Sequence, residues 1–410
     1  MKSEEGLARR PEGVSQFATA KITNNDSLPS GEGRERGQRI EWLDAMRGFT
    51  MLLVVAYHVA QFGFQENEKT SAALPFLVLF RMPLFFFVSG FLAYKTNFVW
   101  NIRNTLPLIG KKLHVQIIPA VIFLCIFIIF KTNGSFWDAF LRAMESPTKN
   151  GYWFTWVLLQ MFLIYYAISI IAQKTLPQLL PCREGEKSQD EGEKTSHSSL
   201  QGRGWGWVFW ITVWLLSIAA YETLYLPKVF KYHQAPIFAY TSFVQTIRFM
   251  QFFLLGNIVH RYWDRVQKLF DSVWFFPLIA TLAVVCCADI FRWHTLKFAW
   301  TNLPRTVAMY TLLLMVVMFF RHCQSWFRQE RPLGKAMQYA GVRTLDIYLL
   351  HFLLIPSLPF VGTWLNAHHP NFLLDILCSI GVAIPVLAAC LLISQMLHTS
   401  KPLGKFLFGK

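Results

Sequence analysis

Three ionisable side chains interrupt stretches of the sequence that are otherwise apolar. His58 ends the run MLLVVAYH, Arg81 lies within LVLFRMPLFFF, and His351 follows IYLL. An ionisable group inside a membrane costs about 2.5–3.5 kcal/mol, so a functional role or a specific partner is expected for each. A neutral imidazole is suited to general-base catalysis near pH 7, and a guanidinium group can stabilise a developing oxyanion. These residues therefore indicate chemistry inside a bundle of helices.

The elements that must position them are membrane-spanning helices. Hydrophobic residues make up 54% of the 410 residues and charged residues 15%, whereas soluble proteins contain about 25% charged residues. A span needs about 20 apolar residues. The sequence predicts an all-α polytopic membrane protein with about ten transmembrane helices, at 46–64, 74–94, 113–130, 153–172, 205–222, 243–260, 273–291, 303–320, 342–361 and 372–398.

The distribution of Lys and Arg predicts the orientation. The segments on the side of the N-terminus hold 26 Lys and Arg residues and the opposite loops hold 8. Because cytoplasmic loops are enriched in these residues, both termini are expected in the cytoplasm. The same rule accounts for the net charge of +15, so nucleic acid is not an expected partner. The lipid bilayer is, and a plasma (inner) membrane location is expected.

Three segments outside the spans are polar. We expect a disordered cytoplasmic tail over 1–40, a ten-helix membrane domain over 41–398 with a mobile loop at 173–204, and a short basic tail over 399–410. The seven cysteines include no C-x-x-C pair. Neither a disulfide framework nor a metal site is predicted.

Depth in the membrane follows from the predicted topology. Arg47 lies at the inner boundary, and His58, eleven residues later, lies about 16 Å further out, near the midplane. Arg81 precedes Met82-Pro83 in the outer half of the second span, where the proline frees backbone carbonyls. His58 and Arg81 are therefore predicted to face one cavity.

The other buried polar residues have structural interpretations as well. Arg248 and Arg305 can extend to the outer headgroups. Asp346 can pair with an Arg or cap a broken helix, and His351 can be an interhelical hydrogen-bond partner.

Three stretches, in this order, resemble the acyltransferase 3 family of integral membrane acyltransferases. EWLDAMRGFTMLLVVAYHV, with Arg47 and His58 separated by ten residues, resembles the family's first span. FRMPLFFFVSGFLAYK, with Arg81, resembles its second span, and GVRTLDIYLLHFLLIP resembles a late span. The resemblance covers most of residues 40–398. KKLHVQIIP departs from the family's basic entry to the third span, since Gln116 stands where a second Arg is usual, and Thr344 replaces a Ser.

The resemblance implies transfer of an acyl group, most often acetyl, from cytoplasmic acyl-CoA to a carbohydrate or glycolipid hydroxyl. Acyl-CoA is then a donor substrate, and no permanently bound cofactor is expected. His58 would deprotonate the acceptor, or carry the acyl group itself. Arg81 and His351 complete the predicted catalytic set. The predicted CoA-binding set comprises Arg47, Lys111 and Lys112, with Asp44 holding Arg47.

Two other classes of function differ in how well they explain the buried cations. An exporter of an anionic glycan or lipid precursor would also use buried Arg and His, although the paired repeats common in transporters are not evident. A scaffold or sensor would give no reason for the positions of Arg47, His58 and Arg81. The aromatic residues Trp137, Tyr152 and Trp153 can line a sugar site or form an interfacial belt.

Overall fold

The computed structural model describes residues 40–96, 98–175, 196–225, 236–293, 303–367 and 371–409, and within them the secondary structure is helical, with no strand. The first half contains α1 (Glu41–His58), η1 (Val59–Gly63), α2 (Leu74–Ala93), α3 (Ile102–Lys112), η2 (Leu113–Ile117), α4 (Ile118–Lys131), α5 (Phe136–Glu145), η3 (Lys149–Gly151) and α6 (Trp153–Thr175). The second half contains α7 (Ser196–Ala220), η5 (Tyr221–Tyr225), α9 (Pro236–Thr241), α10 (Phe243–Arg261), α11 (Trp263–Phe270), α12 (Phe275–Ala288), η6 (Asp289–Trp293), α13 (Leu303–His322), η7 (Gln324–Phe327), α14 (Pro332–Val342), α15 (Thr344–Leu354), α16 (Pro359–Ala367), α17 (Phe372–Thr399) and α18 (Lys401–Phe408).

The protein is an all-α, multi-pass membrane protein. Among the described residues, eight helices are long and apolar enough to cross a membrane, or nine if the bent pair α15 and α16 counts as one span. The one predicted span not counted among these, 243–260, forms α10, a helix of 19 residues with a mostly buried surface. Because α10 contains several polar residues, its hydropathy is lower than that of the other spans. The sidedness of the termini stays a prediction from the charge distribution.

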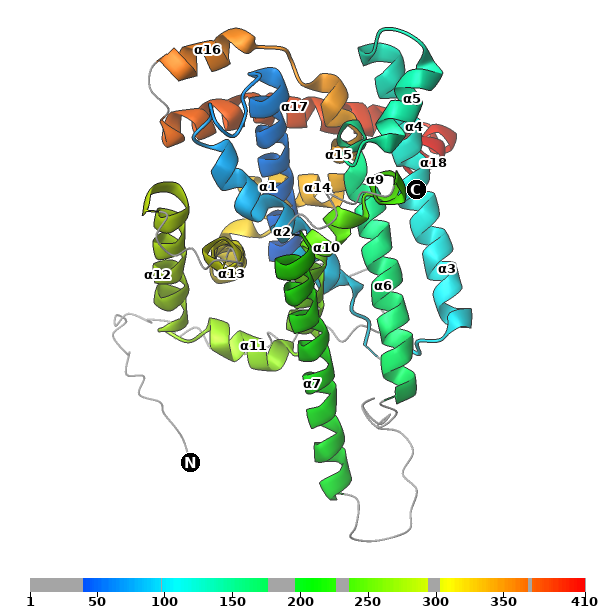
Figure 1. Cartoon of the computed structure of the whole chain (residues 1–410), viewed down its shortest axis with the longest axis vertical. Helices are drawn as coiled ribbons and strands as arrows, with labels where there is room; N and C mark the ends of the chain where they lie inside the picture. The colour runs from blue at the N-terminus through cyan, green and yellow to red at the C-terminus, as the bar shows by residue number, and fades with distance from the viewer. Residues whose placement is uncertain are drawn as a thin grey trace, which may run out of the picture.

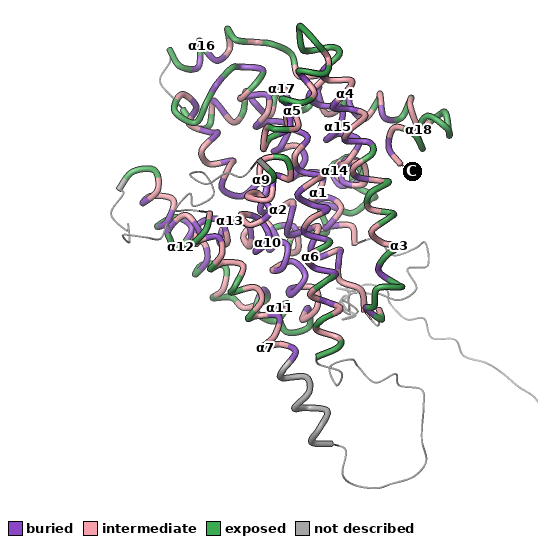
Figure 2. Tube along the Cα trace, turned by 45° about the vertical axis from the view of Figure 1, so that its right-hand side comes forward, coloured by how far each residue is buried: buried purple, intermediate pink, exposed green. Residues whose placement is uncertain are grey.

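The first two spans and α10 form the centre of the bundle. Figure 1 shows α1, α2 and α10 surrounded by the other helices, and buried residues concentrate on these central elements in Figure 2. Two glycines bring α2 and α10 together: a side chain at Gly90 would meet the backbone of Phe253, and one at Gly256 would meet that of Phe87. Small residues allow such close helix crossings in membranes. The crossing fixes Arg81 on α2 relative to α10.

A second glycine pair joins α1 to α14. A side chain at Gly48 would meet the carbonyl of Met337, and one at Gly341 would meet that of Asp44. This close approach places the N-terminal half of α1 beside the start of α15, which follows α14 after one residue. Both predicted histidines, on α1 and α15, are thereby held on adjoining helices.

The predicted span over 342–361 is not one straight helix. α15 ends at Leu354, shortly after His351, and α16 begins at Pro359 after a bend of 86°. Pro356 and Pro359 lack the N–H groups that a continuous helix requires, which explains the break. The N–H of Leu358 in this break donates to the carbonyl oxygen of Gly63 at 2.7 Å, which joins the loop after His351 to the turn after His58.

Most of the predicted polar segments lie outside the described residues. This applies to residues 1–39 of the predicted N-terminal tail and to 176–195 of the predicted loop. Within the predicted C-terminal tail, residues 401–408 form the short helix α18.

Candidate functional site

The structure brings His58 and His351 into direct contact, although 293 residues separate them in the sequence. The Nδ1 atom of His58 lies 2.9 Å from Nε2 of His351. The two rings lie nearly parallel, with centroids 5.1 Å apart. His351 is fully buried, whereas His58 is partly accessible. The interhelical hydrogen bond predicted for His351 is therefore present, and its partner is the other predicted catalytic histidine.

The hydrogen bonds determine which ring nitrogens carry protons. The Nδ1 atom of His351 lies 3.0 Å from the carbonyl oxygen of Ile347, which can only accept, so Nδ1 carries the proton. In a neutral ring Nε2 then accepts, and Nδ1 of His58 donates to it. Neutral His58 consequently holds a lone pair on Nε2, and no described residue donates a hydrogen bond to that atom. This is the tautomer that a general base requires.

His58 lines a cavity of about 590 Å³, which we call the outer cavity. The π-helical turn η1 begins directly after His58 and widens the end of α1, a local form common at functional sites. Phe352 packs against the His58 ring at a centroid distance of 4.7 Å. The lining comes from α1, η1, α2, α4, η3 and the residue before it, α6, α10, α15 and the break after α15: Tyr57, His58, Gln61, Phe62, Val78, Arg81, Met82, Phe127, Lys131, Thr148, Asn150, Gly151, Trp153, Gln245, Arg248, Phe249, Phe352, Ile355 and Ser357.

Arg81 lines the same cavity, as the sequence predicts. Its guanidinium carbon lies 3.4 Å from the ring centroid of Tyr57, the residue before His58. The side chain is buried, and its Nε has no hydrogen-bond partner among the described residues. A buried guanidinium with an unpartnered donor beside the histidine pair is suited to stabilising negative charge there.

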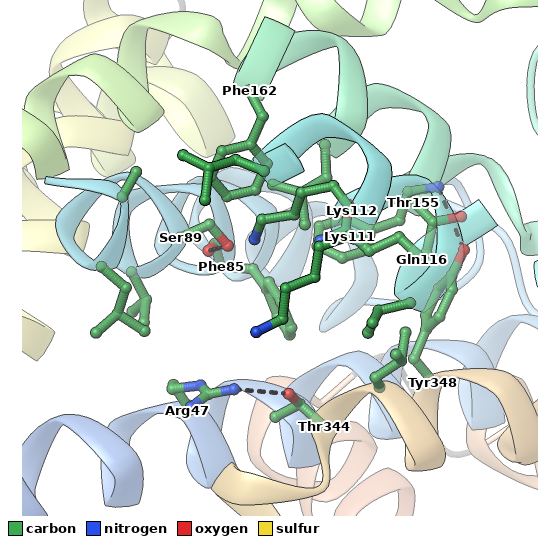
Figure 3. A pocket seen from close by; sticks show the side chains of 18 of the residues that line it. Arg47, Phe85, Ser89, Lys111, Lys112, Gln116, Thr155, Phe162, Thr344 and Tyr348 are labelled. Carbon is green, nitrogen blue, oxygen red and sulfur yellow. Dashed lines mark hydrogen bonds between the residues drawn. The ribbon is translucent and has the colours of Figure 1, made fainter. Parts of the chain in front are cut away.

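A second pocket of about 400 Å³, the inner pocket, lies toward the opposite end of α1. Figure 3 shows Lys111 and Lys112 on one wall, with Arg47 and Thr344 on the facing wall. The three cations come from two elements, the N-terminal half of α1 and the end of α3. The predicted set Arg47, Lys111 and Lys112 therefore shares one pocket, whereas its role in binding CoA stays a prediction.

Arg47 is held in place from two sides. Its Nη1 donates to Oδ1 of Asp44 at 3.1 Å, and its Nη2 donates to Oγ1 of Thr344 at 3.2 Å. Asp44 itself does not line the pocket. The predicted Asp44–Arg47 pair thus forms, and Asp44 acts on the pocket by orienting the guanidinium group.

Sequence reasoning missed Lys95 and underrated Gln116, and both line the inner pocket. Burial, together with the positive charge of Lys111, lowers the pKa of Lys95. Gln116 lies in the π-helical turn η2, where its Oε1 is buried with no donor among the described residues. The only sequence signal for Gln116 was its replacement of an expected Arg. The pocket therefore combines crowded cations with an unpaired amide oxygen.

A thin partition separates the two spaces. Tyr348 lines the inner pocket, and its hydroxyl donates to the carbonyl oxygen of Gly151, which lines the outer cavity, at 2.9 Å. The same hydroxyl accepts from the N–H of Phe154 at 3.2 Å. Phe154 in turn packs edge-on against Phe85 at 4.6 Å. His351 lies one turn beyond Tyr348 on α15, so the histidine pair adjoins this partition.

Asp346 belongs to a different contact. Its Oδ2 accepts from Ser394 at 2.8 Å and lies 3.0 Å from Nε2 of His398, both on α17. The partners shown here are a serine and a histidine of α17, and the predicted pairing with an Arg stays a prediction. Asp346 joins α15 to α17 and does not line either pocket.

The three predicted aromatic residues have different environments. Trp153 lines the outer cavity. Tyr152 is fully buried and donates to the carbonyl oxygen of Leu349 at 3.1 Å, whereas Trp137 is 70% exposed. Only the first of these positions is suited to contact a ligand in the outer cavity.

One comparison with known proteins gives a match. The family model of the acyltransferase 3 type, described as an acyltransferase domain, matches residues 40–395. This match includes both pockets and the histidine pair. No curated protein and no solved structure matches the chain.

Proposed function

Because the chain belongs to the acyltransferase 3 family, we propose that it moves an acyl group, most often acetyl, from acyl-CoA to a hydroxyl of a carbohydrate or glycolipid. The observation that carries this proposal is the pair of histidines at the outer cavity, with Nε2 of His58 left as the free base. The family match covers almost the whole membrane domain, which supports acyl transfer by an enzyme embedded in the bilayer.

The inner pocket is suited to the donor. Acyl-CoA carries several phosphate groups, and Lys111, Lys112 and Lys95 offer ammonium groups beside the oriented guanidinium of Arg47. The pantetheine arm contains amide N–H groups, for which the unpaired Oε1 of Gln116 is an acceptor. The thioester would then extend past the partition at Tyr348 toward His58. With the N-terminus in the cytoplasm, as the distribution of Lys and Arg predicts, the inner pocket would open to the cytoplasm.

The chemistry follows from the protonation of the histidine pair. Nε2 of His58 takes the proton of the acceptor hydroxyl, and the oxygen attacks the thioester carbonyl carbon. The positive charge that develops on His58 is shared through its Nδ1–H bond to His351. Arg81 stabilises the oxyanion of the tetrahedral intermediate. When the C–S bond breaks, CoA leaves as the thiolate and receives the proton from His58.

The experiment uses the purified protein in lipid nanodiscs with radiolabelled acetyl-CoA and a membrane extract as acceptor. Wild-type protein is expected to release CoA and to transfer the label. The variant His58→Ala is expected to lose at least about a hundredfold in rate, the range for removal of a general base. The matched control is His322→Ala, an exposed histidine at the end of α13, which should retain activity.

The transporter alternative predicts another result. Flux of an anionic glycan without any consumption of acetyl-CoA would contradict the proposed enzyme. Full activity of His58→Ala would contradict the assigned base, provided that the variant elutes as wild type in size-exclusion chromatography.

A further inference from the structure

The outer cavity contains more positive charge than acyl transfer requires. Arg81, Lys131 and Arg248 line it, and none of its lining residues is an Asp or Glu. Resting on the proposed function, we infer that the acceptor carries an anionic group, a carboxylate or a phosphate, which Arg248 binds. The reaction itself needs one cation near the thioester carbonyl, and Arg81 beside Tyr57 and His58 supplies it.

Arg248 is held for binding rather than free to extend to the headgroups. Its Nη1 donates to the hydroxyl of Tyr225 at 3.0 Å. The guanidinium carbon lies 4.9 Å from the ring centroid of Phe249 and 5.3 Å from that of Tyr225. Two aromatic rings and one hydroxyl thus fix the orientation of the planar group, which is the geometry for bidentate recognition of a carboxylate or phosphate.

The charge of Arg248 has no counter-ion in the described part of the chain. No Asp or Glu of that part lies within ion-pair distance of it, and its Nε is buried without a hydrogen-bond partner. Glu68, whose charge acts on Arg81, is exposed and does not line the cavity. The side chain is half-buried, and its buried Nε–H is costly without a partner, so an anionic ligand would supply the missing interaction.

The surroundings of Arg248 are suited to a sugar. Phe249 and Trp153 stack with ring centroids 5.9 Å apart, and both line the cavity. An apolar ring face can contact the C–H face of a sugar, while the side chains of Gln245 and Asn150 in the same lining offer hydrogen bonds to hydroxyls. Lys131, at the end of α4, adds a second positive charge. The combination favours an anionic sugar over a neutral one.

The anion could also belong to the transferred group, as the terminal carboxylate of a dicarboxylic acyl chain. Arg248 lies with the aromatic pair of α6 and α10, whereas the histidine pair lies on α1 and α15. A short acyl chain held at His58 would occupy only part of a cavity of about 590 Å³. We therefore assign the anion to the acceptor.

The test compares three probes with the full chain in nanodiscs: methyl glucuronide, glucose 6-phosphate and methyl glucoside. Binding is read first as the shift in unfolding temperature without donor, and then as acceptor-dependent CoA release from acetyl-CoA. Arg248→Gln is compared with Arg248→Lys, which keeps the charge, and with Lys405→Gln, an exposed lysine of α18. CoA release in the absence of acceptor serves as the control for the donor site.

The glucuronide or the phosphate is expected to bind more tightly than the glucoside, and the stronger of the two identifies the source of the anion. Arg248→Gln should weaken that binding by at least roughly tenfold, the effect of one charge-assisted hydrogen bond, with partial rescue in Arg248→Lys. Equal binding of all three probes, or unchanged binding in Arg248→Gln, would overturn the inference.

Two further outcomes distinguish an anion on the acceptor from an anion on the acyl group, and the anion site from the proposed function. If Arg248→Gln raises the KM for succinyl-CoA and leaves the preference among the sugars unchanged, the anion belongs to the acyl group and the inference is wrong. Binding of an anionic sugar through Arg248 by a wild-type protein that consumes no acyl-CoA would support the anion site while contradicting the proposed function.

Discussion

The two pockets are both positively charged, but their cations differ in kind. The inner pocket presents Lys95, Lys111 and Lys112 with one arginine. The outer cavity presents Arg81 and Arg248 with one lysine, and each guanidinium lies against an aromatic ring. Lys95 and Lys112 also lie near aromatic rings. The difference is in the charged group itself, because an ammonium is a point charge whereas a guanidinium is planar and presents its donors in a fixed geometry.

This difference suggests a division of tasks across the partition at Tyr348. Flexible ammonium groups suit a donor with several phosphates, which must enter and leave in every cycle. Fixed guanidinium groups suit a site where the position of a reacting oxygen or an anionic substituent has to be controlled. Substitutions in the inner pocket should therefore affect donor affinity, and substitutions in the outer cavity should affect the chemical step.

Among the substitutions that test this division of tasks, His351→Leu is expected to have the largest effect on activity. In His351→Leu the Nδ1–H of His58 loses its acceptor, so the tautomer of His58 is no longer fixed. We expect kcat to fall by about a hundredfold with little change in the KM for acetyl-CoA, as for a misplaced catalytic group. His351→Gln keeps an oxygen that can accept this bond, and partial recovery is expected. Equal activity in both variants would contradict the role of the hydrogen bond.

A smaller effect is expected in the inner pocket. Replacing Lys111 and Lys112 together by Gln removes two ammonium groups that face Arg47. The KM for acetyl-CoA should rise by roughly tenfold or more, with kcat nearly unchanged, because the loss of even one charge-assisted hydrogen bond costs about 1.5–3 kcal/mol. Steady-state kinetics at two salt concentrations measure this change. A fall in kcat at constant KM would break the division between the two pockets.

The smallest expected effect is on the free energy of unfolding, and it arises from Glu66. Glu66 follows the turn after His58 and is only 4% exposed. Burial, and then the charge of Asp375, raise the pKa of Glu66 from 4.5 to about 7. The folded protein binds this proton more tightly than the unfolded chain, so the stability is full below pH 4.5, falls as the pH rises to about 7, and then levels off.

Glu66→Gln should remove this pH dependence and stabilise the protein at pH 8 by up to roughly 3 kcal/mol, because one pKa unit corresponds to 1.36 kcal/mol. Thermal unfolding between pH 4.5 and pH 8 measures the effect. The control is Glu68→Gln at an exposed position two residues away, which should follow wild type. The same slope in Glu66→Gln as in wild type would show that Glu66 does not titrate in this range.

The sequence was sufficient to predict the helices and several pairs of residues that lie close together. The apolar runs predict the helices, and the depths of His58 and Arg81 in the first two spans, with the proline beside Arg81, predict that both side chains face one cavity. The pair Asp44 and Arg47 follows from its spacing of three residues, which lie on one face of a helix.

Long-range packing was beyond the reach of the sequence. The contact between His58 and His351 depends on the glycine crossing of α1 with α14 and on the break after α15. Arg248 could be read from depth alone as a headgroup-facing residue, since Tyr225, its hydrogen-bond partner, lies 23 residues earlier. Local periodicity contains no information on such pairs.

The central claim is that the donor is bound on the side of Arg47 and reacts at His58. It is tested most directly in proteoliposomes of known protein orientation, with acetyl-CoA supplied on one face only and the anionic sugars supplied on the other. We expect CoA release only when acetyl-CoA is on the face of Lys111 and Lys112, and release slowed by at least about a hundredfold in His58→Ala. CoA release from either face, or unchanged release in His58→Ala, would contradict it.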